Sequence, residues 1–443
     1  MSLFITTPTA SLLPPTSRRI SPVATSKLTS PARSPAASPT LSFVARITML
    51  PSAARRTGRA ALTSPYATSL TAMTSRDQLL QTLHDAIAAW DPIDDPLTWP
   101  EEHLLELARP LFEYQYTHNL AYRTLCRNRG VGPSADLRLA QIPAVPTDAF
   151  KALDLFSGPE RVRTFRTSGT TQGARGQHHF ATLELYRAAM HPTFVRFCNP
   201  ETSALRLIIL APSPADLPDS SLSFMLGELM ERWGAAGSSF VVELREGAWH
   251  LDPKTLERAL HEACADATPT MLLGTAFGFV ELLDRTDACW QLPEGSRLME
   301  TGGFKGRSRT VDKADLYRLF EERLGIPAGR CISEYSMTEL SSQTYTDALA
   351  SPEPTGRLFA PPWLNLSVVD PLTLQPLSEP GATGLIRFVD LANLDSVMAV
   401  QTSDRGILHP DGSLELLGRA PDAELRGCSL TIEEIVEGVD PRR

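Results

Sequence analysis

An alternation of short apolar runs with amphipathic stretches, between residues 205 and 324, constrains the fold of this 443-residue chain most strongly. The run Leu205–Ala211, apolar apart from Arg206, is typical of a strand that is buried on both faces. Further strands are predicted at 239–244, 270–273 and 297–300, and helices at 221–233, 253–267, 276–283 and 311–324. This alternation predicts an α/β fold, in which helices flank a mainly parallel sheet and ligand loops follow the carboxyl ends of its strands.

The segments on either side of this region differ from it. Apolar residues recur at helical spacing in 79–90 and 101–129, which predicts two helices near the start of the fold. After residue 360 the pattern is β-like, with turn signals at Pro380–Gly381 and Asp411–Gly412. A small β-rich part is therefore expected at the C-terminal end.

Charge is distributed unevenly along the chain. Residues 1–76 contain nine Lys or Arg and no Asp or Glu, so the rest of the chain carries a net charge of −18. A strongly acidic body without an evident basic face argues against general nucleic-acid binding. The six cysteines form no C-x-x-C pair and have no zinc-site spacing, which indicates reduced thiols in a cytoplasmic protein. No stretch reaches the roughly 20 apolar residues of a membrane span.

Residues 1–72 are rich in Ser, Thr, Pro, Ala and Arg. That composition is typical of a disordered extension, because little of it can be buried to offset chain entropy. It also suits an organellar transit peptide, and a third interpretation is a misassigned start upstream of Met73. We favour disorder or a misassigned start over a working import signal.

A glycine- and hydroxyl-rich segment occupies Arg166–Gly176. Its glycines let the backbone approach a ligand, and consecutive backbone N–H groups in such loops form anion sites. The residues expected to hold phosphate are Thr167, Ser168, Gly169, Thr170, Thr171 and Gly173. The spacing of an ordinary P-loop is missing from this segment, and the alternative is a surface turn.

Three later segments, at 334–339, 402–406 and 418–427, follow this loop in an order that resembles the core motifs of the adenylate-forming (ANL) enzyme superfamily. The chain is more closely similar to its acyl-protein synthetases, the LuxE family. That likeness rests on Ile142–Lys151, Thr301–Arg307 and Arg426–Leu430, and extends from about residue 78 to 430.

The resemblance implies roles for individual residues. The 167–173 segment would hold the β- and γ-phosphates of ATP, and Gly302 and Gly303 would lie against adenine. In the motif that begins at Tyr335, Thr338 would contact the α-phosphate and Glu339 would bind Mg²⁺, which prefers oxygen ligands. Asp404 would accept from the ribose hydroxyls, and Arg419 would contact ribose or phosphate. The alternatives are a plain turn at the two glycines, a solvated helix cap at Glu339 and a surface ion pair at Arg419.

The resemblance also implies an architecture. The fold would be the N-terminal domain type of the adenylate-forming enzymes, with a helical part at 73–160, an ATP- and acyl-binding core at 161–430 and a short tail at 431–443. Most of these enzymes continue into a mobile lid domain with a catalytic lysine, and we expect that full domain to be missing here. Its absence weakens any role that needs the lysine.

Cys428 is the predicted acyl acceptor. In the acyl-protein synthetases a C-terminal cysteine takes the acyl group from the adenylate, and this segment matches that region. A thiolate is a strong nucleophile, and a neighbouring cation such as Arg426 would depress the pKa of the thiol. The alternative is a small buried apolar residue, the commonest role of a free cysteine. His178 and His179 follow the glycine-rich loop, and we assign no role to either.

The sequence therefore predicts a ligase that uses ATP and Mg²⁺ to activate a carboxylic acid, by resemblance a fatty acid. Its acyl group would pass to Cys428 and then to a partner such as an acyl reductase or an acyl carrier. Two alternatives stay open. A phenylacetate-type acyl- or aryl-CoA ligase would use free CoA as the acceptor, and a non-catalytic protein would only bind an acyl group or a nucleotide.

Overall fold

The computed structural model describes residues 75–168, 174–302 and 311–421, together with residues 428, 431, 432 and 435. All of them belong to one unit, which spans Thr68–Arg443. The predicted extension at 1–72 lies outside the described residues. None of the helices in the described ranges is both long and apolar enough to cross a membrane.

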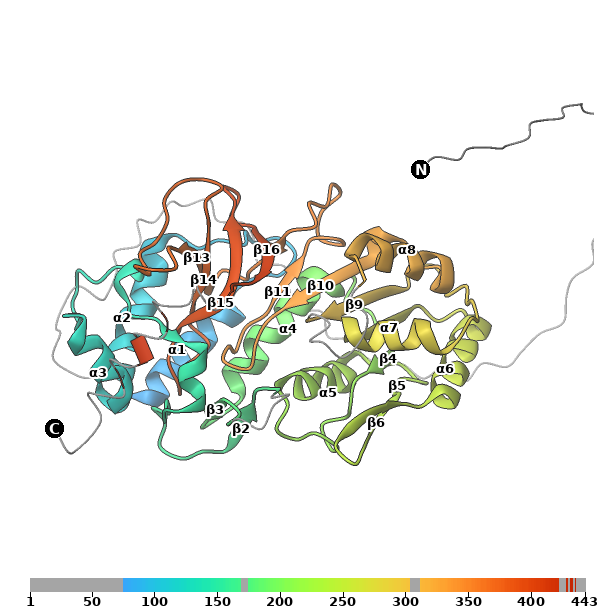
Figure 1. The fold of residues 1–443 in the computed structure, drawn as a ribbon, viewed down its shortest axis with the longest axis horizontal. Coiled ribbons are helices and arrows are strands. Elements are labelled where there is room, and N and C mark those ends of the chain that lie inside the picture. The colour runs from blue at the N-terminus through green and yellow to red at the C-terminus, as the bar shows by residue number, and fades with distance from the viewer. Residues whose placement is uncertain are drawn as a thin grey trace, which may run out of the picture. The chain divides into compact units, whose positions relative to one another are not determined.

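A 12-stranded sheet organises this unit (Figure 1). One half is parallel, in the order β10-β9-β8-β4-β5. Its strands are β4 (Arg206–Leu210), β5 (Ser239–Phe240), β8 (Thr270–Thr275), β9 (Arg297–Thr301) and β10 (Cys331–Tyr335). The predicted parallel sheet is therefore present, and the edge where β9 and β10 end is the one at which ligand loops are expected.

The other half continues from β10 as antiparallel strands in the order β11-β12-β16-β15-β14-β13. These strands are β11 (Thr344–Thr346), β12 (Leu358–Phe359), β13 (Leu364–Val369), β14 (Thr383–Asp390), β15 (Ala399–Leu408) and β16 (Leu414–Arg419). Strand β1 (Val145–Pro146) joins β15 in parallel. The β-rich part predicted after residue 360 thus extends the main sheet.

Helices cover both faces of the parallel half. The helices are α4 (Glu184–Cys198) and α5 (Ser221–Trp233) on one face, and α6 (Pro253–Asp266), α7 (Ala276–Arg285) and α8 (Lys313–Leu324) on the other. Strand β4 explains this arrangement, because Leu207 and Ile209 pack with α4 and α5 whereas Ile208 and Leu210 pack with α6, α7 and α8. The prediction of a strand buried on both faces is confirmed.

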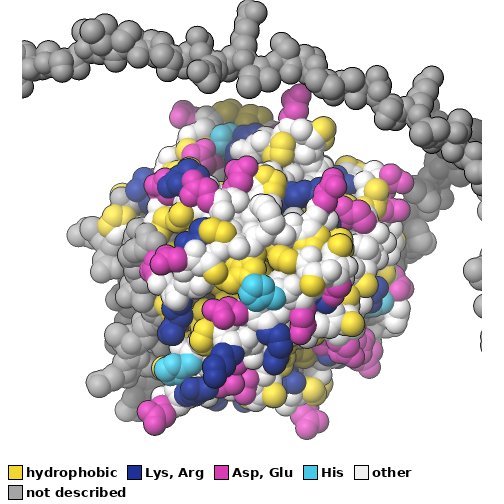
Figure 2. Space-filling model, turned by 90° about the vertical axis from the view of Figure 1, so that its right-hand side faces the viewer, with side chains coloured by type: hydrophobic (Ala, Val, Ile, Leu, Met, Phe, Trp, Pro, Cys, Tyr) yellow, Lys and Arg dark blue, Asp and Glu magenta, His cyan; other side chains and the backbone are white. Residues whose placement is uncertain are grey.

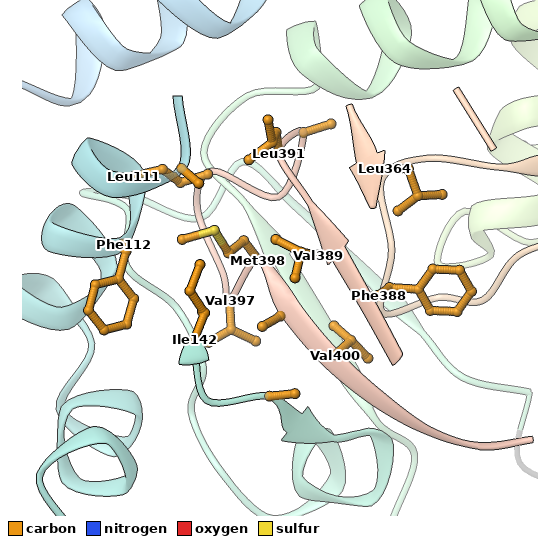
Figure 3. Packing of buried hydrophobic residues seen from close by; sticks show 14 of the residues in the cluster. Leu111, Phe112, Ile142, Leu364, Phe388, Val389, Leu391, Val397, Met398 and Val400 are labelled. Atoms are coloured by element: carbon orange, nitrogen blue, oxygen red, sulfur yellow. The ribbon is translucent and has the colours of Figure 1, made fainter. Parts of the chain in front are cut away.

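The three N-terminal helices pack with the antiparallel half. They are α1 (Arg76–Ala88), α2 (Glu101–His118) and α3 (Leu120–Asn128). Figure 3 shows Leu111 and Phe112 of α2 in the same core as Ile142, Val397 and Met398. At the start of α1, the Arg76 guanidinium binds both carboxylate oxygens of Asp395, at 2.6 and 2.8 Å.

Short elements complete the described fold. They are the hairpins β2 (Arg163–Arg166) with β3 (Gln177–Phe180) and β6 (Val242–Arg245) with β7 (Ala248–Leu251), and the 3₁₀ turns η1 (Leu139–Gln141), η2 (Thr147–Lys151) and η3 (Ala328–Arg330). Figure 2 looks onto the end where α6, α7 and α8 lie. On that face acidic and basic side chains are interspersed. Within α7, Arg285 pairs with Glu281 at 2.7 Å.

The strand expected at 239–244 is divided into β5 and β6, which belong to different sheets. Two further differences concern helices. The single helix predicted over 101–129 is wrong, because Asn119 has an extended backbone and its side chain accepts the N–H of Tyr122, which starts a new helix. Helix α4 was not predicted. It carries Pro192 inside and is apolar around most of its circumference, so it lacks a clear amphipathic stripe.

Candidate active site

The candidate site begins at the carboxyl ends of β9 and β10. Thr301 and Glu334 are partners in register, so Gly302 and Tyr335 lie at the same edge of the sheet. Gly302 has a φ of +68° and is exposed, and a Cβ built there would meet no atom within 4 Å. A left-handed backbone beside open space leaves room for a ligand against the peptide. Gly303 lies outside the described residues.

Tyr335 joins β10 to β15. Its hydroxyl donates a 2.8 Å hydrogen bond to Oδ2 of Asp404. Burial, reinforced by Asp404, raises the pKa of Tyr335 well above its ordinary value, so the hydroxyl remains a donor. Arg419 of β16 is the register partner of Asp404, and its Nε lies 3.7 Å from Oδ1. The Arg419 side chain is 79 % exposed and that of Asp404 is 21 % exposed, so both are accessible from solvent.

Glu339 lies in the turn that follows β10. It is buried, and burial raises the pKa of its carboxyl to about 7. Lys151 of η2 opposes this shift and Asp148 reinforces it. The alternative of a solvated helix cap is wrong, since no helix begins there and the side chain is enclosed. A buried carboxylate next to Thr338, which is predicted to contact phosphate, is a suitable ligand for a divalent cation.

The glycine-rich segment is the loop of the β2–β3 hairpin, and its base is closed. Thr167 and Gly176 exchange two hydrogen bonds: Thr167 N donates to Gly176 O at 3.0 Å, and Gly176 N donates to Thr167 Oγ1 at 2.9 Å. The Arg175 guanidinium binds Thr167 O and Asp219, at 2.6 and 2.7 Å. Ser168 is exposed at the mouth of the loop. Four predicted phosphate-binding residues, Gly169, Thr170, Thr171 and Gly173, lie outside the described residues.

His178 ties this hairpin to the segment after β10, a role that the sequence did not reveal. Its ring is buried, and Nδ1 lies 2.8 Å from the carbonyl oxygen of Thr338. Burial lowers the pKa of His178 to about 4, so the ring is neutral near pH 7. A chain of contacts therefore connects Thr167 to Thr338. Thr167 binds Gly176, which directly precedes β3, and His178 of β3 binds Thr338.

Cys428 is enclosed in this arrangement. It packs in an apolar cluster with Val369, Leu385 and Ala420, and Ala420 directly follows Arg419. Burial raises the pKa of the thiol to about 11; Asp148 adds to the shift and Arg129 opposes it. The expected depression of this pKa by a sequence neighbour is wrong, and Arg426 lies outside the described residues. The Arg129 guanidinium also donates a 2.6 Å hydrogen bond to Thr431.

Glu334 is a second buried carboxyl group at this edge, and no sequence pattern indicates its ionisation state. The Thr301 hydroxyl donates to it. Burial raises the pKa of Glu334 to about 7, although the hydroxyls of Ser336 and Thr301 oppose the shift. No group of three or more His, Cys, Asp or Glu in the described ranges could hold a metal ion by itself.

The raised pKa of Glu334 makes a prediction about stability. The folded state holds this proton more tightly than the unfolded state, so the contribution is present below about pH 4.5 and is lost as pH rises through 7. The unsubstituted protein should therefore lose unfolding free energy from pH 5 to pH 8, and Glu334→Gln should not. The difference between the two proteins should shift in favour of Glu334→Gln by on the order of 2 kcal/mol over that range. Urea unfolding at both pH values measures this. The exposed Glu353→Gln is the control, and an equal gain in both variants would contradict the assignment.

Comparisons with known proteins show the family and the fold. Residues 85–436 match the family model described as acyl-protein synthetase, LuxE. Two relatives named long-chain-fatty-acid–luciferin-component ligase are each 22% identical. The one from Aliivibrio fischeri aligns over 79% of this chain and 96% of its own length, and the one from Vibrio harveyi over 81% and 97%.

The solved structures that resemble this chain include those of 2-hydroxyisobutyryl-CoA ligase. Its open conformation, in complex with 2-HIB-AMP and CoA, has a TM-score of 0.52 and 16% identity, covering 76% of this chain and 81% of that one. Its postadenylation state has a TM-score of 0.50 and 15% identity, covering 75% and 72%. At such identities the likeness shows the adenylate-forming fold. Together with the match over 85–436, it establishes that this chain belongs to the acyl-protein synthetase, LuxE, family.

Proposed function

We propose that this protein converts a carboxylic acid and ATP into an acyl-adenylate and then transfers the acyl group to the thiol of Cys428. The observation that supports this most directly is the convergence of distant segments. Contacts link the base of the glycine-rich loop to Thr338, and link Tyr335 to Asp404 and Asp404 to Arg419. Residues 73–160 would be the helical part of the enzyme, 161–430 its ATP- and acyl-binding core and 431–443 a tail.

In the first half-reaction, a carboxylate oxygen attacks the α-phosphorus of ATP and the bond to the β,γ-phosphates breaks. Pyrophosphate leaves with that electron pair. Both reactants are anions, so the site must orient them and offset their charge. In our proposal Asp404 accepts from the ribose hydroxyls, Gly302 lies against adenine and the Thr338 hydroxyl contacts the α-phosphate.

The donor set around Glu339 suits Mg²⁺. One buried carboxylate, completed by phosphate oxygens and water, is a common arrangement for this ion, which seldom uses an all-protein cage. When bound, Mg²⁺ would neutralise phosphate charge. Arg419, whose side chain is largely exposed beside Asp404, can reach a bound nucleotide without first leaving a core.

In the second half-reaction, the sulfur of Cys428 forms a bond to the acyl carbon, the bond to the AMP oxygen breaks and the thiol proton passes to solvent. The position of Cys428 supports this step, because it packs against Ala420, the neighbour of Arg419. Asp148 also acts electrostatically on both Glu339 and Cys428. The thiol must leave its apolar cluster before it ionises.

The relatives bear on the substrate. Their names support a long-chain fatty acid as the acid. As the final acceptor we propose an acyl reductase or a carrier protein. All six cysteines are free thiols, which supports a reducing compartment such as the cytoplasm. One observation favours a second function: the enclosed Cys428, with its raised pKa, also suits an enzyme that uses free CoA as the acceptor.

Acid-dependent exchange of labelled pyrophosphate into ATP tests the proposal. The protein should catalyse exchange with long-chain fatty acids, and Asp404→Asn should lower kcat/KM for ATP by about tenfold because a hydrogen bond to a charged group is lost. The control is Asp411→Asn, in the exposed turn between β15 and β16, which should stay within about twofold of the unsubstituted enzyme. A protein that binds ATP and supports no exchange with any fatty acid would disprove the function.

A further inference from the structure

Two buried side chains hold the carbonyl groups of two consecutive residues in the candidate site. Nδ1 of His178 lies 2.8 Å from the Thr338 oxygen, and Nδ2 of Asn393 donates to the Glu339 oxygen at 2.9 Å. A carbonyl oxygen only accepts, so each side chain must be the donor. His178 comes from β3 and Asn393 from the turn after β14, so the two donors belong to elements that are far apart in the sequence.

Both donors are fixed in place by their surroundings. The Asn393 side chain also donates to Val397 O at 3.2 Å and accepts from the Ser341 hydroxyl at 2.6 Å. Its own carbonyl accepts a 2.6 Å hydrogen bond from the buried Gln115. The His178 ring lies 4.1 Å from that of Phe180 and 6.0 Å from that of Phe150, centroid to centroid. His178 and Asn393 line the same small cavity.

The segment that they hold has little regular structure of its own. Residues 336–343 form a turn between β10 and β11, and side chains replace the missing ladder of backbone bonds. Asp390, for example, accepts the N–H groups of Ser341 and Ser342, both at 2.9 Å. When two successive carbonyls are held, the peptide between Thr338 and Glu339 cannot rotate, and this fixes the directions in which both side chains project.

We propose that His178 and Asn393 are positioning residues for adenylation, and that they orient Thr338 and Glu339 through the backbone. This inference rests on the proposed function. His178 also couples the base of the glycine-rich loop to Thr338. The loop and Thr338, which are both expected to contact the phosphates, then move together. Because a misplacement of about 1 Å can cost about 100-fold in rate, loss of either donor should be felt in kcat.

His178 can be tested with matched variants. Asn places an amide N–H where Nδ1 stands, whereas Leu offers no donor and Gln moves the amide outward. We expect His178→Leu to lower kcat for pyrophosphate exchange by at least about tenfold, with KM for the acid nearly unchanged, and His178→Asn to recover most of the loss. The control is His179→Leu, on the other face of β3, where Nδ1 contacts the Thr164 hydroxyl at 2.8 Å.

The outcomes distinguish failure of the positioning role from failure of the proposed adenylation function. Exchange that persists in His178→Leu, or that falls equally in His178→Leu and His178→Asn, overturns the positioning role alone. Absence of exchange in the unsubstituted protein overturns the function and this role with it. Should His178→Leu not fold, the comparison of His178→Asn with His178→Gln decides, because only the Asn amide reaches Thr338. Asn393→Asp, which keeps the shape and removes the donor, should lower kcat in the same way.

Discussion

Cys428→Ala is expected to abolish covalent acylation of the protein while acid-dependent pyrophosphate exchange stays within about twofold of the unsubstituted enzyme. The two half-reactions use different groups, because adenylation needs no thiol and transfer has no other nucleophile in our proposal. After incubation with ATP and a labelled fatty acid, the denatured protein should retain label that neutral hydroxylamine releases. In the variant this label should fall by about 100-fold or more.

The buried state of the thiol sharpens this experiment. With a pKa of about 11, roughly one thiol in a thousand is ionised at pH 8. Alkylation of Cys428 by iodoacetamide should therefore be slow in the free enzyme, and slower still once ATP and acid are added, because the acylated sulfur cannot react. The exposed Cys289 provides the control, because Cys289→Ala should keep the acyl label. Turnover that is unchanged in Cys428→Ala and accelerated by CoA, with no label retained on the denatured unsubstituted protein, would instead favour the CoA ligase.

Arg76→Met is expected to reduce the free energy of unfolding by about 3 kcal/mol, because removal of one partner leaves a buried charge uncompensated. The Asp395 side chain is 3% exposed and that of Arg76 is 15% exposed, and two hydrogen bonds join them. In the variant, the Asp395 carboxylate would keep the hydrogen bond that its Oδ2 accepts from the Ala181 N–H, at 3.0 Å. Urea unfolding can be followed by tryptophan fluorescence, since Trp90 packs edge-on to Trp363 in the same core.

A surface pair gives the contrast. Arg138 and Glu102 lie 3.4 Å apart with side chains that are 57% and 73% exposed, so Arg138→Ala should cost less than about 0.5 kcal/mol. The double variant Arg76→Met/Asp395→Leu should recover much of the loss, because it removes the charge as well as its partner. A loss below about 1 kcal/mol in Arg76→Met would show that the pair does not hold α1 in place.

The sequence was most informative for elements whose structure follows from the local spacing of apolar residues. The apolar strand at 205–211 and the helix at 221–233 could be predicted because burial follows a local period. Tyr335 and Asp404 could be proposed from short motifs, and the structure joins them by a hydrogen bond. Their site roles remain predictions for the experiments above.

What could not be predicted depends on residues that are distant in sequence. His178 and Asn393 act on Thr338 and Glu339 from other elements, and no local pattern separates His178 from its neighbour His179. The ionisation of Cys428 was predicted with the wrong sign, because sequence adjacency to a cation is a weaker influence than burial in an apolar cluster.

The pairing of β1 with β15 has a consequence for biosynthesis. It places Val145 beside Val400, and the core of α1, α2 and α3 is completed by strands that are translated late. At roughly 5–20 residues per second, a ribosome needs tens of seconds to supply them. The apolar sides of α1, α2 and α3 stay exposed to solvent throughout that time. The parallel half, in contrast, can assemble from segments that are close together in the sequence. The early-made part of this enzyme is therefore where a chaperone should bind the nascent chain.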